Sequence, residues 1–415
     1  MRSTLISSVV ALMISATSAQ ALESSMTARS SLSPADLWKK IGDFCGITAW
    51  DPAIEWCDLS EDGKQRTIQF FGGIGRVVAH LENWDTSNLI FSWTSSSALS
   101  PVSNYRARVS VTEDGQTSAL KLTASYDANG VSDAEAQKII DGAIYRSLCI
   151  SGPLLCSDDP RSATPAEVVG FEGQSFSSTP LTLRGYLRRP DGVGPFPAVV
   201  LLHGCNGFAG QLDQNWGMKI ADWGYVTLTV DRFGPRRLKN TCRGGGPPDV
   251  AFDAYRALDF LVQQQFVDPR RVIVVGFSQG GWLSLSSVER GFVEQTSEKK
   301  FRAAAAFYPP CTAVKGPMTV PTLILIGDND DWTPADACRK LVNGQDDLGV
   351  SRRKGEGEPM QLIVYPSAHH GFDLQSLQMP VQYFGHHLEF NKAAADQSSD
   401  ALRDFLQSVT GEPGK

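Results

Sequence analysis

The residues best suited to chemistry form the segment Gly276-Phe277-Ser278-Gln279-Gly280. An apolar run over residues 271–276 predicts a buried strand before this serine, and a helix is predicted to start just after it. A sharp strand–turn–helix connection exposes the serine hydroxyl, and small residues two positions before and after it avoid a clash. The start of a helix also favours negative charge developing on the oxygen. This spacing predicts that Ser278 is a nucleophile.

A serine hydroxyl needs a general base at neutral pH. Among the six histidines, His369 and His370 follow the last predicted strand, 361–365. The chain order serine, acid, histidine is typical of α/β hydrolases and favours His370. His369 stays open as the alternative, because adjacent side chains point in different directions. We interpret His203, at the end of an earlier strand, as a residue that braces its loop.

The acid that orients this histidine should follow a strand between the serine and the histidine. The predicted strand 322–326 is followed by Asp328, Asp330 and Asp331. Asp330 has the usual spacing, three residues after a glycine and four before Pro334, so we predict it as the third catalytic residue. Asp331 is the second choice and Asp328 the third. The two that are not catalytic would cap the helix predicted to begin at Pro334.

Two backbone N–H groups are predicted to stabilise the oxyanion of a tetrahedral intermediate. One belongs to Gln279, directly after the nucleophile, and the other to Cys205, in the loop after the strand that ends at residue 203. Arg236 is a candidate for binding a substrate carboxylate, because its guanidinium offers a bidentate fork. The alternative is that Arg236 pairs with Asp231 or Asp253.

The elements around these residues alternate between strands and helices over residues 168–411. Continuous apolar runs predict strands that are covered on both faces, after a strand pair spanning 174–187. Repeated β–α units predict a mainly parallel sheet with helices on both faces. The strands are expected at 196–203, 225–230, 271–276, 303–308, 322–326 and 361–365, and the helices at 211–223, 249–265, 281–290, 334–343 and 391–409.

This second block resembles the dienelactone hydrolase family. The resemblance rests on Leu202-His-Gly-Cys-Asn-Gly207, Asp231-Arg-Phe-Gly-Pro-Arg236, the serine turn, the acid loop and Tyr365-Pro-Ser-Ala-His-His-Gly-Phe-Asp373. It implies an α/β-hydrolase fold and a carboxylic ester hydrolase without cofactor or metal. The family's namesake enzymes use a cysteine nucleophile, whereas residue 278 is serine. We therefore expect the serine branch, acting on an ester or lactone through an acyl-enzyme.

A first block, residues 30–152, predicts an α+β domain. A helix begins near Ser33, alternating apolar and polar residues predict an antiparallel meander, and a long helix is expected at 132–148. The strands are expected at 65–71, 75–82, 89–94, 105–111 and 119–126. The order of these elements resembles the polyketide cyclase/START-like (SRPBCC) superfamily. The resemblance also rests on the segments Leu37-Trp38-Lys39, Trp50-Asp-Pro-Ala-Ile54 and Gly72-Gly73. The resemblance implies a curved sheet, a long C-terminal helix and a cavity for an apolar ligand. We predict a linker over residues 153–167.

Residues 1–21 predict a secretory signal peptide. One basic residue precedes a short apolar stretch, and Ala19-Gln20-Ala21 offers a cleavage pattern before about Leu22. We expect a periplasmic or secreted protein. In that setting an even number of cysteines favours disulfides over free thiols or a metal site. Neighbours in sequence suggest the pairs Cys45–Cys57, Cys149–Cys156, Cys205–Cys242 and Cys311–Cys338.

A net charge of −7 argues against a nucleic-acid partner, and no apolar run is long enough to span a membrane. The partner expected is a small ester or lactone. Two other functions stay open. One is a carrier of lipids or polyketides whose second domain is a scaffold. The other is a peptidase of the prolyl oligopeptidase kind, which shares the serine turn and the order of the triad.

Overall fold

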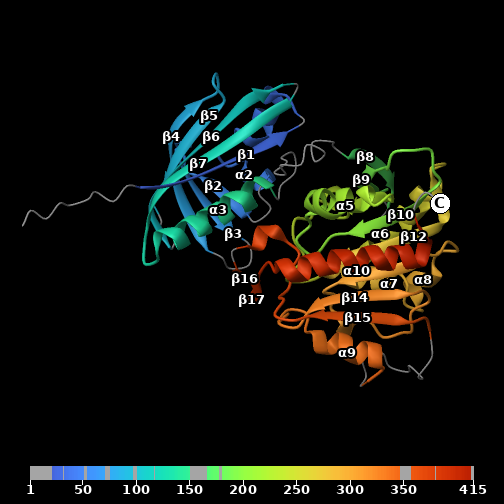
Figure 1. Cartoon of the computed structure of the whole chain (residues 1–415). Helices are drawn as coiled ribbons and strands as arrows, with labels where there is room; N and C mark the ends of the chain where they lie inside the picture. Colours follow the sequence, from blue (N-terminus) through green and yellow to red (C-terminus); the bar gives the residue numbers. More distant parts are fainter. Residues whose placement is uncertain are drawn as a thin grey trace, which may run out of the picture.

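The computed structural model describes residues 21–412 except 31, 51–53, 71–74, 97–100, 116, 150–165, 177–179, 346–356 and 379. Two large β-sheets dominate these residues (Figure 1). The first takes its strands from β1–β7 and the second from β8–β15. Their hydrophobic cores have no residue in common. The predicted combination of an α+β half and an α/β half is confirmed.

The first sheet is antiparallel, in the order β1-β7-β6-β5-β4-β3-β2. Buried and less buried residues alternate along β7, so one face of the sheet packs on the core. Ser33 caps α1 by accepting a hydrogen bond from the Asp36 N–H. Helix α3 packs against β1 and β7. The elements are β1 Leu22–Ser30, α1 Pro34–Ile41, α2 Ile47–Trp50, β2 Ile54–Leu59, β3 Gln65–Phe70, β4 Arg76–Asp85, β5 Ile90–Ser95, β6 Val102–Asp114, β7 Thr117–Ala128 and α3 Asp133–Cys149.

Strands β1 and β2 were not expected from the sequence. β1 pairs with β7 from Leu22 opposite Tyr126 to Ser30 opposite Ser118, so the sheet starts before residue 30, the predicted start of this domain. The residues of β1 that are buried include Ser24 and Ser30. Small polar residues on the buried face hide the apolar alternation on which the prediction of a strand depends.

The second sheet has the order β15-β14-β13-β12-β10-β11-β9-β8. Strands β10 to β15 pair in parallel, whereas β9 pairs antiparallel with both β11 and β8. Every residue of β10, β11, β13 and β14 is buried, so both faces of the central sheet are covered. The strands are β8 Glu167–Glu172, β9 Thr182–Arg188, β10 Phe196–Leu202, β11 Val226–Asp231, β12 Val267–Phe277, β13 Ala303–Phe307, β14 Thr322–Gly327 and β15 Met360–Tyr365.

Helices α6 and α7 pack against the centre of this sheet, and α9 and α10 pack at the β14–β15 end (Figure 1). A short hairpin of β16 and β17 precedes α10. The elements are α4 Ala209–Leu212, α5 Met218–Asp222, α6 Asp253–Leu261, α7 Gln279–Ser286, α8 Phe292–Gln295, α9 Ala335–Asn343, β16 Val381–Tyr383, β17 His386–Leu388 and α10 Lys392–Thr410.

Some boundaries differ from those predicted. The strand pair expected at 174–187 is β8 with β9, and β8 lies wholly before residue 174. The helix expected at 211–223 is α4 and α5 joined by a π-helical turn, Asp213–Gly217. The helix expected at 249–265 begins with a 3-10 turn, Pro248–Phe252, and α6 ends at Leu261. The apolar pattern predicted a helical stretch in each place, but not the change of hydrogen bonding within it.

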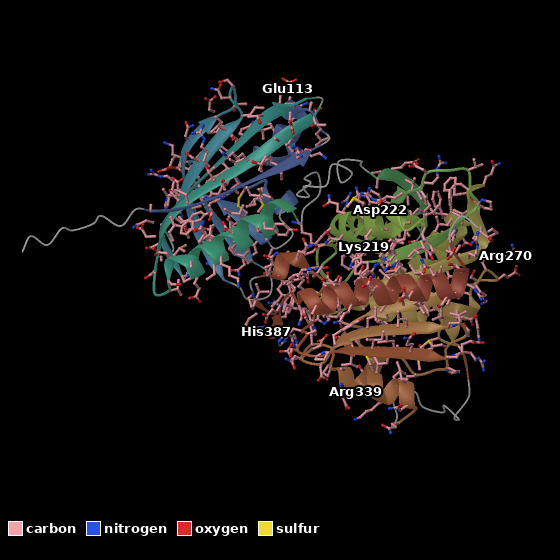
Figure 2. The ribbon with its side chains drawn as sticks, in the orientation of Figure 1. Glu113, Lys219, Asp222, Arg270, Arg339 and His387 are labelled. Carbon is pink, nitrogen blue, oxygen red and sulfur yellow. A yellow bond between two sulfur atoms is a disulfide. The ribbon has the colours of Figure 1, made fainter. Side chains whose placement is uncertain are left out.

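Three of the four suggested disulfides are present: Cys45–Cys57, Cys205–Cys242 and Cys311–Cys338. The fourth suggested pair includes Cys156, which lies outside the described residues, as do residues 1–20 of the predicted signal peptide and nearly all of the predicted linker. Charged side chains such as Glu113, Asp222, Arg270 and Arg339 are exposed at the edges of the two halves (Figure 2). Within the described part of the chain, no helix combines the length and apolar content that crossing a bilayer requires.

Candidate active site

Ser278 lies on a strained turn between β12 and α7. Its backbone has φ 54° and ψ −118°, a conformation that L-residues rarely adopt. A Cβ atom on Gly276 would lie 1.9 Å from the Gly280 carbonyl oxygen. A Cβ atom on Gly280 would lie 2.1 Å from the Leu202 carbonyl oxygen. Glycine is therefore required on both sides, and the turn presents the Ser278 side chain above the sheet.

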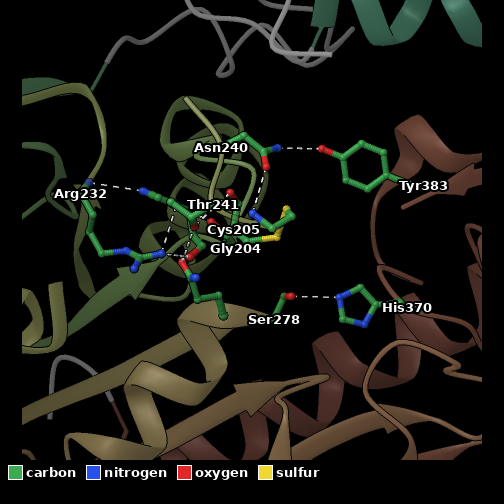
Figure 3. The surroundings of a disulfide bond; sticks show 11 residues. Gly204, Cys205, Arg232, Asn240, Thr241, Ser278, His370 and Tyr383 are labelled. Atoms are coloured by element: carbon green, nitrogen blue, oxygen red, sulfur yellow. Dashed lines mark hydrogen bonds between the residues drawn. A yellow bond between two sulfur atoms is a disulfide. The ribbon is translucent and has the colours of Figure 1, made fainter. Parts of the chain in front are cut away.

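A chain of two hydrogen bonds joins Ser278, His370 and Asp330. The Ser278 Oγ lies 3.0 Å from the His370 Nε2 (Figure 3). The other ring nitrogen, His370 Nδ1, lies 2.8 Å from the Asp330 Oδ2. The three residues follow three different strands of the parallel sheet. Ser278 and His370 are 92 positions apart in sequence, and Asp330 and His370 are 40 positions apart. The structure thus brings together the three side chains that the sequence singled out.

Asp330 follows β14 in a buried loop. Its Oδ1 accepts hydrogen bonds from the backbone N–H groups of Trp332, at 3.0 Å, and Thr333, at 2.8 Å. Burial by itself would raise the pKa of the Asp330 carboxyl, but the adjacent His370 and the hydrogen bonds from Thr333 together lower the pKa below its ordinary value of 3.8. The carboxylate is held in its charged form beside the imidazole, which is the form that can stabilise an imidazolium.

The alternative residues point elsewhere. The ring of His369 packs against His387, with 4.2 Å between centroids. The Asp331 carboxylate accepts the His387 N–H at 3.2 Å and is about half exposed, and Asp328 pairs with Arg339. Neither aspartate contacts His370 among the interactions of the described residues. Geometry therefore favours His370 over His369 and Asp330 over both other aspartates.

His203 is buried behind the loop that follows β10. Its Nδ1 donates to the Gly204 carbonyl at 2.8 Å, and its Nε2 accepts the Arg232 N–H at 3.3 Å. Burial, together with the charge of Arg232, holds the pKa of His203 well below its ordinary value. A neutral ring with both nitrogens engaged braces the loop, in agreement with the interpretation of His203 from sequence.

The loop that carries Cys205, the second predicted oxyanion donor, is held by a disulfide and by hydrogen bonds. Cys205 is joined to Cys242 by a disulfide, and its carbonyl accepts the Thr241 N–H at 2.8 Å (Figure 3). The Thr241 hydroxyl in turn donates to the Gln279 side chain at 3.2 Å. Gln279 is the first residue of α7, so its own N–H has no partner within the helix. Cys205 and Ser278 line the same cavity, whereas Gln279 is not part of its lining.

Arg236 is placed differently from the prediction that it binds substrate. Its guanidinium is buried and makes two hydrogen bonds of 2.8 Å with Asp253, and it also lies 3.4 Å from Asp249. It does not line the cavity beside Ser278. The substrate-binding prediction is therefore wrong. Leaving Asp253 buried without its partner would be costly, which explains why this arginine is held inside.

The cavity beside Ser278 measures about 640 Å³ when the open solvent at its mouth is included. Most of the residues that line this cavity were not predicted from the sequence. Asp373, three residues after His370, accepts hydrogen bonds from the Tyr308 hydroxyl at 2.7 Å and the Trp216 Nε1 at 2.8 Å. Its place in the motif ending Gly-Phe-Asp373 was the one available signal. The lining includes Asn206, Phe208, Gln211, Leu212, Asn215, Trp216, Phe277, Tyr308, Trp332, Asp373, Leu374, Tyr383 and Leu388.

One group of side chains in the described part of the chain could hold a metal ion. Donor atoms of His369, His387 and Glu389 lie within 4.8 Å of one another. His387 already lies 3.0 Å from Glu389, so these two side chains also satisfy each other. The cluster is not apparent in the sequence, because a loop and a hairpin that lie apart in sequence bring its residues together.

Several known proteins are similar to parts of this chain. Dipeptidyl peptidase 8 of Mus musculus is 32% identical over 147 residues, which cover 30% of this chain and 15% of that protein. A thermophilic esterase of Thermogutta terrifontis with bound propionate is 18% identical, with a TM-score of 0.44, covering 62% of this chain and 98% of its own. A dienelactone hydrolase-like promiscuous phosphotriesterase from metagenomic libraries is 16% identical, with a TM-score of 0.44, covering 60% and 100%. The chain thus spans about 15% of the length of the curated peptidase.

Two protein families match the two halves of the chain. The family described as polyketide cyclase/dehydrase and lipid transport matches residues 21–148, which contain the first sheet and α3. The dienelactone hydrolase family matches residues 183–410, which contain Ser278, Asp330 and His370. The second match spans more than half of the sequence and includes the whole parallel part of the second sheet. This chain belongs to the dienelactone hydrolase family.

Proposed function

We propose that this protein is a carboxylic ester hydrolase that forms an acyl-enzyme on Ser278. The observation that carries the proposal is the chain of hydrogen bonds from Ser278 Oγ through His370 to the Asp330 carboxylate, at the wall of a cavity. A nucleophile, a base and a group that orients the base are the requirements for this chemistry. Membership of the dienelactone hydrolase family supports the same conclusion.

In the first half of the reaction, His370 Nε2 takes the Ser278 proton as Oγ attacks the ester carbonyl. The C–O bond to the alcohol then breaks, and the alcohol leaves with that proton. In the second half, water gives a proton to His370 and attacks the acyl carbon, so the acid leaves and Ser278 recovers its proton. Backbone N–H groups of Gln279 and Cys205 are proposed to donate to the oxyanion in both halves.

The test is turnover of p-nitrophenyl butyrate by the full chain and by Ser278→Ala. We expect the variant to lose several orders of magnitude in kcat, because the hydroxyl bonded to the base nitrogen, His370 Nε2, is that of Ser278. Ser286→Ala, on the same helix α7, is the matched control and should keep wild-type turnover. A fluorophosphonate probe should label the wild-type chain at Ser278. Undiminished turnover by Ser278→Ala would reject the proposal.

A second candidate function is cleavage of peptide bonds. It is favoured by the similarity to dipeptidyl peptidase 8, although that similarity covers 15% of the peptidase. A panel that pairs each p-nitrophenyl ester with the p-nitroanilide of the same acyl group separates the two functions. Ester hydrolysis predicts turnover of the esters far above that of the anilides. Comparable rates on both would favour the peptidase.

We also propose that the chain is exported. Removal of residues 1–21 would leave β1, which begins at Leu22, intact in the first sheet. Disulfides in both halves of the chain are consistent with an oxidising compartment. N-terminal sequencing of the protein from a periplasmic or secreted fraction should begin at about Leu22. A mature chain that keeps Met1 and remains in the cytoplasm would contradict export.

We also propose that the first half of the chain shapes the access of an apolar ligand or substrate to the cavity. The Tyr145 hydroxyl of α3 lies 3.5 Å from the Gln375 Oε1, five residues after His370. Glu55, at the start of β2, acts electrostatically on Tyr383, which lines the cavity. The Tyr145–Gln375 contact joins the first half to a segment that borders the cavity, next to the lining residue Leu374.

A further inference from the structure

The cavity beside Ser278 has a largely apolar lining, in which Asp373 is the acidic side chain. Aromatic and aliphatic side chains such as Phe208, Trp216 and Leu374 line it, together with the amides of Asn206 and Asn215. None of the residues that line it is a lysine or an arginine. A substrate bound here would meet ring faces, methyl groups and neutral hydrogen-bonding groups, and no cation that could pair with a carboxylate.

Three basic side chains around the site have contacts of their own. Arg236 is held by Asp253 through two hydrogen bonds, and its side chain is 7% exposed. Arg232 is fully buried behind the loop and donates to the His203 carbonyl. Lys219 of α5 (Figure 2) lies 4.8 Å from the ring centroid of Trp216, and it is absent from the lining. Reaching the cavity would require each of these side chains to leave its present contacts.

The acidic group in the lining makes a second negative charge unfavourable. The two oxygens of Asp373 each accept one hydrogen bond, from Tyr308 and Trp216. Burial raises the pKa of Asp373 above its ordinary value, so this carboxyl already bears a cost of desolvation. A substrate carboxylate in the same cavity would lose its hydration without gaining a counter-ion, and would be repelled by Asp373 whenever that group is charged.

We infer that the substrates of this site are esters of uncharged acids, and that the site discriminates against esters whose acyl part carries a free carboxylate. This inference rests on the proposed function and specifies its substrate class. The basis of the discrimination is a cavity wall in which Asp373 is the fixed acidic group and none of the described lining residues is a lysine or an arginine.

The experiment compares ethyl butyrate, monoethyl succinate and diethyl succinate as substrates of the full chain, with ethanol release as the measurement. The first two acyl groups are nearly equal in size but differ by one negative charge. Diethyl succinate is larger and neutral, so it separates the effect of charge from that of size. We expect kcat/KM for monoethyl succinate to be about 100-fold or more below that of both neutral esters.

A matched pair of variants tests the cause. Asn215 lines the cavity and is exposed, so its side chain can be lengthened at the rim without disturbing the core. Asn215→Arg supplies a cation and should raise kcat/KM for monoethyl succinate about tenfold relative to ethyl butyrate. Asn215→Gln is also longer but neutral, and it should leave the ratio of the two substrates unchanged.

The possible outcomes separate a failure of the inferred substrate class from a failure of the proposed hydrolase function. Turnover of monoethyl succinate within about threefold of diethyl succinate, abolished by Ser278→Ala, would overturn the substrate class and leave the hydrolase function intact. Turnover of ethyl butyrate that survives Ser278→Ala would reject the function itself. An equal gain in the substrate ratio from Asn215→Gln and Asn215→Arg would show that charge is not the cause.

Discussion

At the scale of single residues, the aspartates after β14 show how burial gives different roles to residues that are adjacent in sequence. Asp330 is buried and bonded to His370, whereas Asp331 is about half exposed and faces the β16–β17 hairpin. The two side chains have the same chemistry and differ in what surrounds them. Because catalysis depends on a fixed imidazole orientation, substituting them should have very different consequences.

Asp330→Asn should lower kcat by a factor on the order of 10³–10⁴, because an amide can no longer hold His370 in the tautomer that accepts the serine proton. Asp331→Asn is the matched control, and its kcat should stay within about threefold of wild type, as is usual for exposed surface substitutions. Steady-state kinetics with p-nitrophenyl butyrate measure both. Similar losses in the two variants would contradict the assignment of Asp330.

The lowered pKa of Asp330 also predicts a dependence of stability on pH. A carboxyl whose pKa is lower in the folded than in the unfolded state stabilises the fold fully above the unfolded value, 3.8, and loses that contribution as the pH falls through the folded value. The difference in unfolding free energy between wild type and Asp330→Asn should therefore be constant above pH ~5 and shrink as the pH falls from ~4 to ~2 in urea titrations. A difference that is constant over this range would contradict the prediction.

At the scale of elements, the oxyanion loop depends on a covalent tether more than on regular structure. Residues 204–207 follow β10, and they are held by the Cys205–Cys242 disulfide and by Thr241, which also contacts Gln279 (Figure 3). Both proposed donors are thus linked through one short segment, 240–242. Precise placement of such donors matters most in the transition state, where the charge develops.

Replacing Cys205 and Cys242 together by serine should lower kcat about tenfold while changing KM little, because a loosened donor weakens transition-state binding more than substrate binding. Replacing Cys45 and Cys57 by serine also removes one disulfide, but in the first half of the chain. That control should leave kcat near the wild-type value. A change confined to KM in the Cys205/Cys242 variant would count against a role in the transition state.

At the scale of the whole molecule, the two halves have separate cores and meet near the cavity. All eight strands of the second sheet come from residues after 166, so the second half contains its complete core. Contact with the first half is made through α3, by Tyr145 and Gln375. We therefore expect the second half to fold alone, and the first half to act on selectivity rather than on the chemical step.

A chain of residues 166–415 should hydrolyse p-nitrophenyl acetate at nearly the wild-type rate but change the ratio of rates between short and long acyl chains. Acetate is small enough to need no contact outside the cavity, whereas longer chains extend toward the mouth. A series of p-nitrophenyl esters of increasing acyl length measures the ratio, and circular dichroism checks folding. If the ratio of rates changes with acyl length in the same way for the two proteins, the proposed role of the first half is wrong.

Features that depend on residues close together in the chain could be predicted from the sequence alone. The serine turn could be predicted because its glycines are imposed by local backbone contacts, and the parallel strands because their apolar runs reflect burial on both faces. Three disulfides could be suggested because each joins cysteines that are neighbours in the series of eight. Strand β1 was missed, because small serines on its buried face hide the alternation.

Contacts made in the folded protein fix which of two adjacent side chains faces the site and which charged groups are paired. The choice of His370 over His369 depends on the hairpin that packs against His369, far along the chain. The role of Arg236 depends on Asp253, which α6 carries into the interior. Both results depend on contacts between segments that are distant in sequence. A buried charge needs a partner, because burying it unpaired would be costly. Local sequence patterns do not show which distant residue will be that partner.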